Sequence, residues 1–171
     1  MLRTFEKVFV EANKWALVLL FTAMAVIVFA NVSLRYLTTG SIIWAEEVAR
    51  YLMIWMTFIG AGLALRVGGH VAISNLQEVL PNLGQKILRS LLVLMLLGFF
   101  CAMIWFGLDY MNRTRFQLTP ATRIPFRYVY AAMPIGFGLL IVHLLLIART
   151  YIETLSFREL EADGTKAAPI D

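Results

Sequence analysis

The sequence predicts an all-α integral membrane protein with four transmembrane helices and a short amphipathic surface helix between the second and third spans. Of its 171 residues, 60% are hydrophobic and only 15% are charged. Its mean hydropathy of +0.76 is well above that of a water-soluble domain of this size. Long stretches are also apolar on every face, whereas a helix of a soluble protein keeps one polar face. These observations place most of the chain in a lipid bilayer.

The first expected span covers residues 15–36. From Trp15 to Leu34 the sequence contains no ionisable residue, and this stretch is long enough to cross roughly 30 Å of hydrocarbon as a helix. A cleavable signal peptide has a shorter apolar core, of about 7–15 residues. We therefore expect this span to belong to the mature protein.

The second expected span covers residues 44–66, and its first two turns contain Glu46, Glu47 and Arg50. The uncharged part that follows is short for a full crossing. The span is therefore long enough only if the charged turns lie at the membrane interface or in a contact with another protein.

The third and fourth expected spans cover residues 88–110 and 127–149. Pro134 lies in the fourth span and is expected to kink it, because proline cannot donate the helical hydrogen bond. Tryptophan and tyrosine cluster at the ends of the spans, where a ring with one polar atom is favoured at headgroup depth. These residues are Trp15, Tyr36, Trp44, Tyr110, Tyr128, Tyr130 and Tyr151.

The segment between spans two and three predicts the surface helix. In residues 71–85, apolar side chains recur at helical spacing and polar side chains fill the other face. A plain loop with a few buried leucines is the alternative. We expect residues 1–156 to form a single transmembrane domain and residues 157–171 to form a flexible cytoplasmic tail.

Lysine and arginine residues near the span ends predict the orientation. One side would hold Arg3, Lys7, Lys14, Arg66, Lys86, Arg89, Arg149, Arg158 and Lys166, and the other Arg35, Arg113, Arg115, Arg123 and Arg127. The positive-inside rule then places both termini in the cytoplasm. The net charge of +4 is thus explained by residues that flank membrane spans, and no nucleic-acid partner is expected.

The charged residues at the start of span two are the strongest candidates for chemistry, because an ionisable group in a membrane span is costly and usually has a use. Arg50 follows Glu46 and Glu47 by four and three positions, within side-chain reach on the helix surface. One interpretation is a proton or ion relay. The other is structural pairing among these residues, with Arg35 across the hairpin, or with a partner protein, and their place in the first turns favours it.

Small residues that are four positions apart, such as Gly60 and Ala64 or Ala132 and Gly136, allow helices to approach closely. We expect these contacts to lie between the spans of this chain. Cys101, the single cysteine, lies in an apolar stretch and is expected to pack in the core.

The two histidines leave a haem-bearing anchor of a respiratory enzyme as an alternative. His70 is expected beyond one end of span two, whereas His143 lies about 9 Å inside the matching end of span four, so one iron could hardly reach both. The sequence shows no Ser-His-Asp arrangement, phosphate-binding glycine loop or clustered metal ligands. We therefore expect neither an enzyme nor a cofactor. A small proton-coupled exchanger that uses a membrane glutamate is the other alternative.

Several motifs occur together in the first half of the chain. Span two begins with Trp-Ala-Glu-Glu-x-x-Arg-Tyr from Trp44 and continues with Phe-x-Gly-Ala-x-x-Ala-x-Arg from Phe58. It is followed by Gly-x-His ending at His70, and by Pro81. As a set, and over nearly the whole chain, these features resemble the small membrane subunit, the DctQ-type component, of tripartite ATP-independent periplasmic (TRAP) transporters.

The resemblance implies an accessory, non-catalytic subunit in the bacterial inner membrane. Its partner would be a large membrane subunit that takes up an organic acid with sodium ions, after a periplasmic binding protein has captured the acid. Sodium coupling is expected in that partner subunit. We expect spans one, two and four to pack on the static part of the partner. The surface helix, with its flanking Arg66, Lys86 and Arg89, would fix the depth of the assembly in the membrane.

Two sets of residues are candidates for these contacts. Structural or partner-interface candidates are Arg35, Trp44, Glu46, Glu47, Arg50, Tyr51, Trp55, Gly60, Arg66 and His70. Arg113, Arg115 and Arg123 could attract an acidic face of the binding protein. A solvated loop without a partner is the alternative for these three arginines.

Overall fold

The computed structural model describes residues 2–38, 40–66 and 82–153. Its helices are α1 (Leu2–Thr38), α2 (Ala45–Arg66), α4 (Asn82–Arg113), α5 (Phe126–Tyr130) and α6 (Ala132–Glu153). Four stretches are long and apolar enough to cross a membrane, and the fourth combines α5 with most of α6. The prediction of an all-α fold with four spans is confirmed.

The helices extend beyond the expected spans. α1 begins at Leu2 rather than near residue 15, and α4 begins at Asn82 rather than near residue 88. Bilayer thickness sets the apolar part of a helix, whereas hydrogen bonding lets its polar ends continue into the interface. Residues 82–85, predicted to end the surface helix, thus belong to α4. The rest of that predicted helix, His70 and the predicted tail lie outside the described residues.

Span four is interrupted after Tyr130, where α5 ends. Pro134 has no amide hydrogen to donate to the Tyr130 carbonyl, and its ring clashes with that group. The amides of Ala131 and Ile135 still donate to carbonyls one turn earlier, at 3.0 and 3.2 Å. The span therefore continues across a local break, as expected from Pro134.

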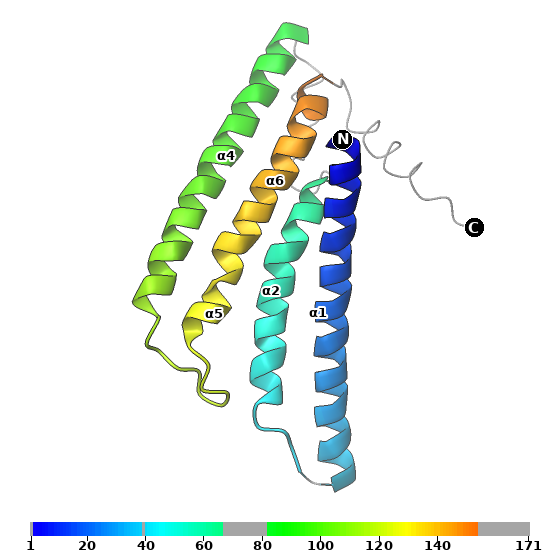
Figure 1. The fold of residues 1–171 in the computed structure, drawn as a ribbon, viewed down its shortest axis with the longest axis vertical. Coiled ribbons are helices and arrows are strands. Elements are labelled where there is room, and N and C mark those ends of the chain that lie inside the picture. The colour runs from blue at the N-terminus through cyan, green and yellow to red at the C-terminus, as the bar shows by residue number, and fades with distance from the viewer. Residues whose placement is uncertain (1, 39, 67–81, 154–171) are drawn as a thin grey trace, which may run out of the picture.

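The four spans stand side by side in one layer (Figure 1). Their order across the layer is α1, α2, α6, α4, because α2 packs mainly between α1 and α6, and α4 packs on α6. Span four therefore lies between spans two and three. We call the end of the layer where α1 begins the terminal end, and the opposite end, which holds residues 40–44 and 114–125, the loop end.

Packing within the layer depends on apolar side chains and on close approaches of the helix backbones. The buried cluster of α2, α4 and α6 comprises Leu65, Phe100, Leu140 and Leu144. A Cβ built on Gly136 of α6 would lie 2.6 Å from Phe58 Cβ and 2.9 Å from the Phe58 carbonyl oxygen on α2. Glycine at this position therefore lets α2 and α6 meet at the backbone.

Gly136→Ala should lower the stability of the protein in mild detergent by about 1–3 kcal/mol, because the added methyl group forces two packed helices apart. Gly138→Ala on the same helix is the matched control, since nothing lies within 4 Å of a Cβ built there. Thermal unfolding followed by size-exclusion chromatography compares the two variants. Equal unfolding midpoints would contradict the close contact.

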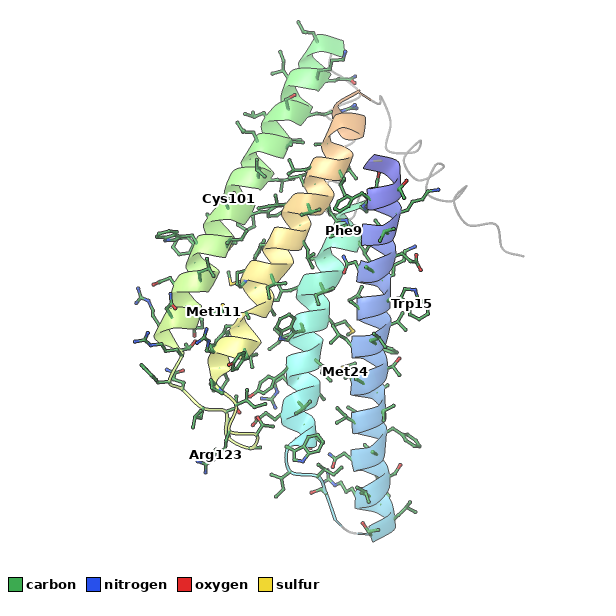
Figure 2. The ribbon with its side chains drawn as sticks, in the orientation of Figure 1. Phe9, Trp15, Met24, Cys101, Met111 and Arg123 are labelled. Atoms are coloured by element: carbon green, nitrogen blue, oxygen red, sulfur yellow. The ribbon has the colours of Figure 1, made fainter. Side chains whose placement is uncertain are left out.

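Outward-facing side chains of α1 and α4 are largely apolar. Trp15 lies on the outer side of α1 and is 59% exposed. Cys101 is also exposed, on α4 (Figure 2), so the prediction that it packs in the core is wrong. In a layer one helix thick, every span keeps surface turned toward lipid, and an apolar side chain has no need of a core position.

Candidate functional site

Four polar side chains from three helices meet at the terminal end. Arg66, the last residue of α2, donates from Nε to Nδ1 of His143 on α6 (3.0 Å). It also donates from Nη2 to the carboxylate of Glu6 on α1 (2.6 Å). The side-chain amide of Asn13, also on α1, lies 2.9 Å from Nε2 of the same imidazole ring. We call these four residues the polar cluster.

His143 is fully buried, at 0% exposed, so both ring nitrogens need hydrogen-bond partners. Because the Arg66 guanidinium can only donate, Nδ1 must be unprotonated, and the proton of the neutral ring lies on Nε2. A half-turn of the Asn13 amide then gives Nε2–H an acceptor in Oδ1, which otherwise is buried without a partner among the described residues. The Nε2–H tautomer therefore gives both ring nitrogens of His143 a hydrogen-bond partner.

Gly62 of α2 leaves the space that the imidazole occupies. A Cβ built there would lie 2.3 Å from His143 Cδ2. On the α1 side, the Phe9 ring packs against the imidazole with 4.9 Å between ring centroids. At this level α6 therefore reaches across α2 to contact α1.

The polar cluster changes the interpretation of two residues. Arg66, which was expected to flank the surface helix, turns its side chain inward toward two acceptors and is only 20% exposed. His143 has both ring nitrogens engaged, which disfavours the haem alternative. Glu6 and Asn13 were not predicted, although their spacing of seven positions, which puts them on one face of α1, was an available signal.

At the loop end, Glu47 in the first turn of α2 binds the loop between α4 and α5. Its carboxylate oxygens accept hydrogen bonds from the backbone amides of Ala121 (2.8 Å) and Thr122 (3.1 Å), and from the Thr122 hydroxyl. Hydrogen bonds to a charged acceptor are the stronger kind. An ionised side chain of α2 thus holds this loop, and we call residues 117–126 the bound loop.

The bound loop has an ordered turn of its own. Thr119 is buried, its hydroxyl accepts from the Ile124 amide (3.0 Å), and its own amide donates to the Ile124 carbonyl (2.9 Å). Arg123 adopts a φ of 56°, in the left-handed region that few non-glycine residues enter. This conformation lies at the turn of the loop, where Figure 2 shows the Arg123 side chain pointing outward.

Arg35, Glu46 and Arg50 line clefts and form no ion pair with the described part of the chain. Arg35 and Glu46 line a cleft of about 140 Å³ between α1 and α2. Beside it, the Asn31 side-chain oxygen accepts from the Ile42 amide (2.7 Å), so Asn31 ties the α1–α2 connection to α1. Glu46 and Arg50 also line a second cleft, of about 480 Å³, between α2, the bound loop and α5.

The remaining candidates on α2 are spread along the helix. Trp44 is exposed just before α2 begins, whereas Tyr51 packs edge-on against an aromatic ring of α5. Trp55 is half-buried. Gly60 faces Leu17 of α1 at an ordinary contact distance of 3.6 Å. The structure therefore distributes these residues over several contacts instead of gathering them into one site.

Two of the three arginines expected to face the binding protein have a local partner. Arg113 donates to the Asp109 carboxylate one helical turn earlier (2.8 Å), and the Arg115 guanidinium lies 4.6 Å from the centre of the Phe116 ring. Within residues 2–38, 40–66 and 82–153, Arg123 forms no ion pair. Its charge is therefore the most available of the three.

The family model for the DctQ component of tripartite ATP-independent periplasmic transporters matches residues 24–153, which is most of the chain. The chain belongs to this family. The DctQ component described here is therefore a multi-pass membrane subunit of a TRAP transporter, as its motifs and its four spans indicated.

This DctQ component is similar to proteins whose names give different solutes. One is the ectoine TRAP transporter small permease protein TeaB of Halomonas elongata, 30% identical over 121 residues (67% of this chain, 60% of that protein). Another is the C4-dicarboxylate TRAP transporter small permease protein DctQ of Vibrio cholerae, 28% identical over 156 residues (74% and 65%).

A third relative is much longer. The chain is 28% identical over 145 residues to the isethionate TRAP transporter permease protein DctMQ of Oleidesulfovibrio alaskensis, which is 82% of this chain but 22% of that protein. The DctQ component thus spans less than two thirds of each of these three relatives.

Proposed function

We propose that this chain is an accessory, non-catalytic subunit that scaffolds the large transport subunit of a TRAP transporter. The assembly takes up an organic acid with sodium ions, after delivery by a periplasmic binding protein. The observation that carries this proposal is the family match over residues 24–153. The chain is similar to about a fifth of one longer permease protein. Because two parts of one polypeptide stay together, this similarity supports a lasting association with a large membrane partner.

The shape of the layer supports a scaffold role. The spans proposed to contact the partner are one, two and four, which are α1, α2 and α6, and these are neighbours in the layer. They therefore offer one continuous surface. The polar cluster joins the same three helices at the terminal end. A surface fixed in this way gives the moving part of the partner a support against which it can move.

Solute uptake into vesicles tests the scaffold role. The large subunit is reconstituted with its binding protein and a sodium gradient, with and without this chain. We expect uptake to fall to background without the chain and to return when the chain is added during reconstitution. Full uptake by the large subunit and binding protein alone would refute the proposal.

We further propose that both termini are cytoplasmic, so that the bound loop faces the periplasm and Arg123 meets the binding protein. Arg123→Gln should then slow uptake at limiting binding-protein concentration by about three- to tenfold at low ionic strength, and less at high salt, because charge steers encounter. Lys14→Gln removes an exposed charge near the terminal end and is the control. Equal rates for the two variants, or a loss insensitive to salt, would contradict this contact.

A further inference from the structure

The cleft of about 480 Å³ at the loop end is lined by both charged and apolar residues. It lies between the first three turns of α2, the bound loop and α5. Its α2 wall carries Glu46, Arg50 and Ile54 at intervals of four residues. Such residues lie on one face of a helix, about 6 Å apart along its axis.

The order of these groups follows the membrane depth of α2. This span begins at Ala45 and runs to Arg66, so each step along the wall goes further into the bilayer. A carboxylate comes first, a guanidinium second and an aliphatic side chain third. Phe126 and Val129 of α5 face the same cleft and add to its apolar part.

Both charges are available for a ligand. A glutamate and an arginine four positions apart often pair on a helix, yet Glu46 and Arg50 form no ion pair with each other or with other described residues. Both side chains are exposed. Glu47, in contrast, has both carboxylate oxygens bonded to the bound loop. The free pair therefore consists of one negative and one positive group, stacked along the membrane normal.

We infer that this cleft binds one phospholipid with an ammonium-bearing zwitterionic headgroup, phosphatidylethanolamine. In a bilayer the ammonium group of this lipid lies outermost, the phosphate lies below it and the acyl chains lie deeper. Arg50 donates to the phosphate, Glu46 accepts from the ammonium group, and the apolar part of the cleft contacts the first acyl carbons. A lipid with a net negative headgroup lacks the ammonium group that Glu46 would bind. Its charge is also disfavoured by the carboxylates of Glu46 and Glu47 at the mouth of the cleft.

Native mass spectrometry of the full chain tests this assignment. The protein is released from nanodiscs that hold equal amounts of phosphatidylethanolamine and phosphatidylglycerol with identical acyl chains. We expect the wild type to retain one phosphatidylethanolamine molecule in preference to phosphatidylglycerol. Arg50→Gln should lower this retention about tenfold, and Glu46→Gln should remove most of the preference between the two lipids.

Three further variants control for charge and folding. Arg127→Gln removes an exposed arginine of α5 that does not line the cleft and should retain the lipid. Arg50→Lys should retain part of it, and Ile54→Trp should exclude it without changing any charge. Equal retention of both lipids by the wild type, equal loss in Arg50→Gln and Arg127→Gln, or exclusion of the lipid when the transporter partner is bound would overturn the inference.

Discussion

Gly62→Ala is expected to lower the free energy of unfolding in mild detergent by about 3 kcal/mol. The new methyl group would lie 2.3 Å from His143 Cδ2, so the imidazole must move. Its movement pulls Nδ1 away from Arg66 and Nε2 away from Asn13, and leaves Nε of Arg66 without its acceptor while the bond to Glu6 remains. Denaturant or thermal unfolding of the purified protein measures the loss.

Two companion variants separate this effect from a general response to alanine. Gly98→Ala on α4 adds the same methyl group where nothing lies within 4 Å, and it should be neutral or slightly stabilising because alanine favours the helix. His143→Ala removes the imidazole, so adding Gly62→Ala to it should cost less than about 0.5 kcal/mol more. Losses that simply add in the double variant would show that the ring and the glycine do not interact.

In Glu47→Gln, the backbone amides of Ala121 and Thr122 should exchange hydrogen for deuterium about ten- to a hundredfold faster than in the wild type. The carboxylate accepts from both amides and from the Thr122 hydroxyl, whereas a carboxamide offers one acceptor and turns an NH₂ group toward a donor. Exchange followed by mass spectrometry of peptides from the bound loop measures the change.

Glu46→Gln provides the matched comparison for this experiment. It makes the same chemical change one position earlier, at a side chain that is exposed and does not bind the loop. Its loop amides should exchange at the wild-type rate. Trypsin should also cleave after Arg123 faster in Glu47→Gln than in Glu46→Gln. Equal exchange rates and equal cleavage rates in the two variants would contradict the role assigned to Glu47.

The fold class and the four spans follow from the sequence because the thickness of the hydrocarbon determines how long an apolar, uncharged helix must be. The order of the spans in the layer does not follow. An apolar side chain is equally at home against lipid and against another helix, so the sequence of α4 gives no sign that Cys101 faces outward. For the same reason the place of α6 between α2 and α4 could not be predicted.

The site was predicted only in part, because the partners of its charged residues are distant in sequence or lack a distinctive side chain. Glu47 was singled out, but Ala121 and Thr122 bind it through backbone amides, which every residue other than proline possesses. Arg66 and His143 are 77 positions apart and meet only once the layer has formed. In the sequence Gly62 cannot be told from any other small residue, because its role depends on the position of the His143 imidazole.

The single-layer arrangement also bears on where a solute could pass. A pore or an alternating cavity needs helices around it on all sides, whereas the described helices stand in one row. The two clefts both involve the first turns of α2, at one edge of the membrane. The described helices, standing in one row, therefore offer a solute surfaces on two sides of a layer rather than a channel between them.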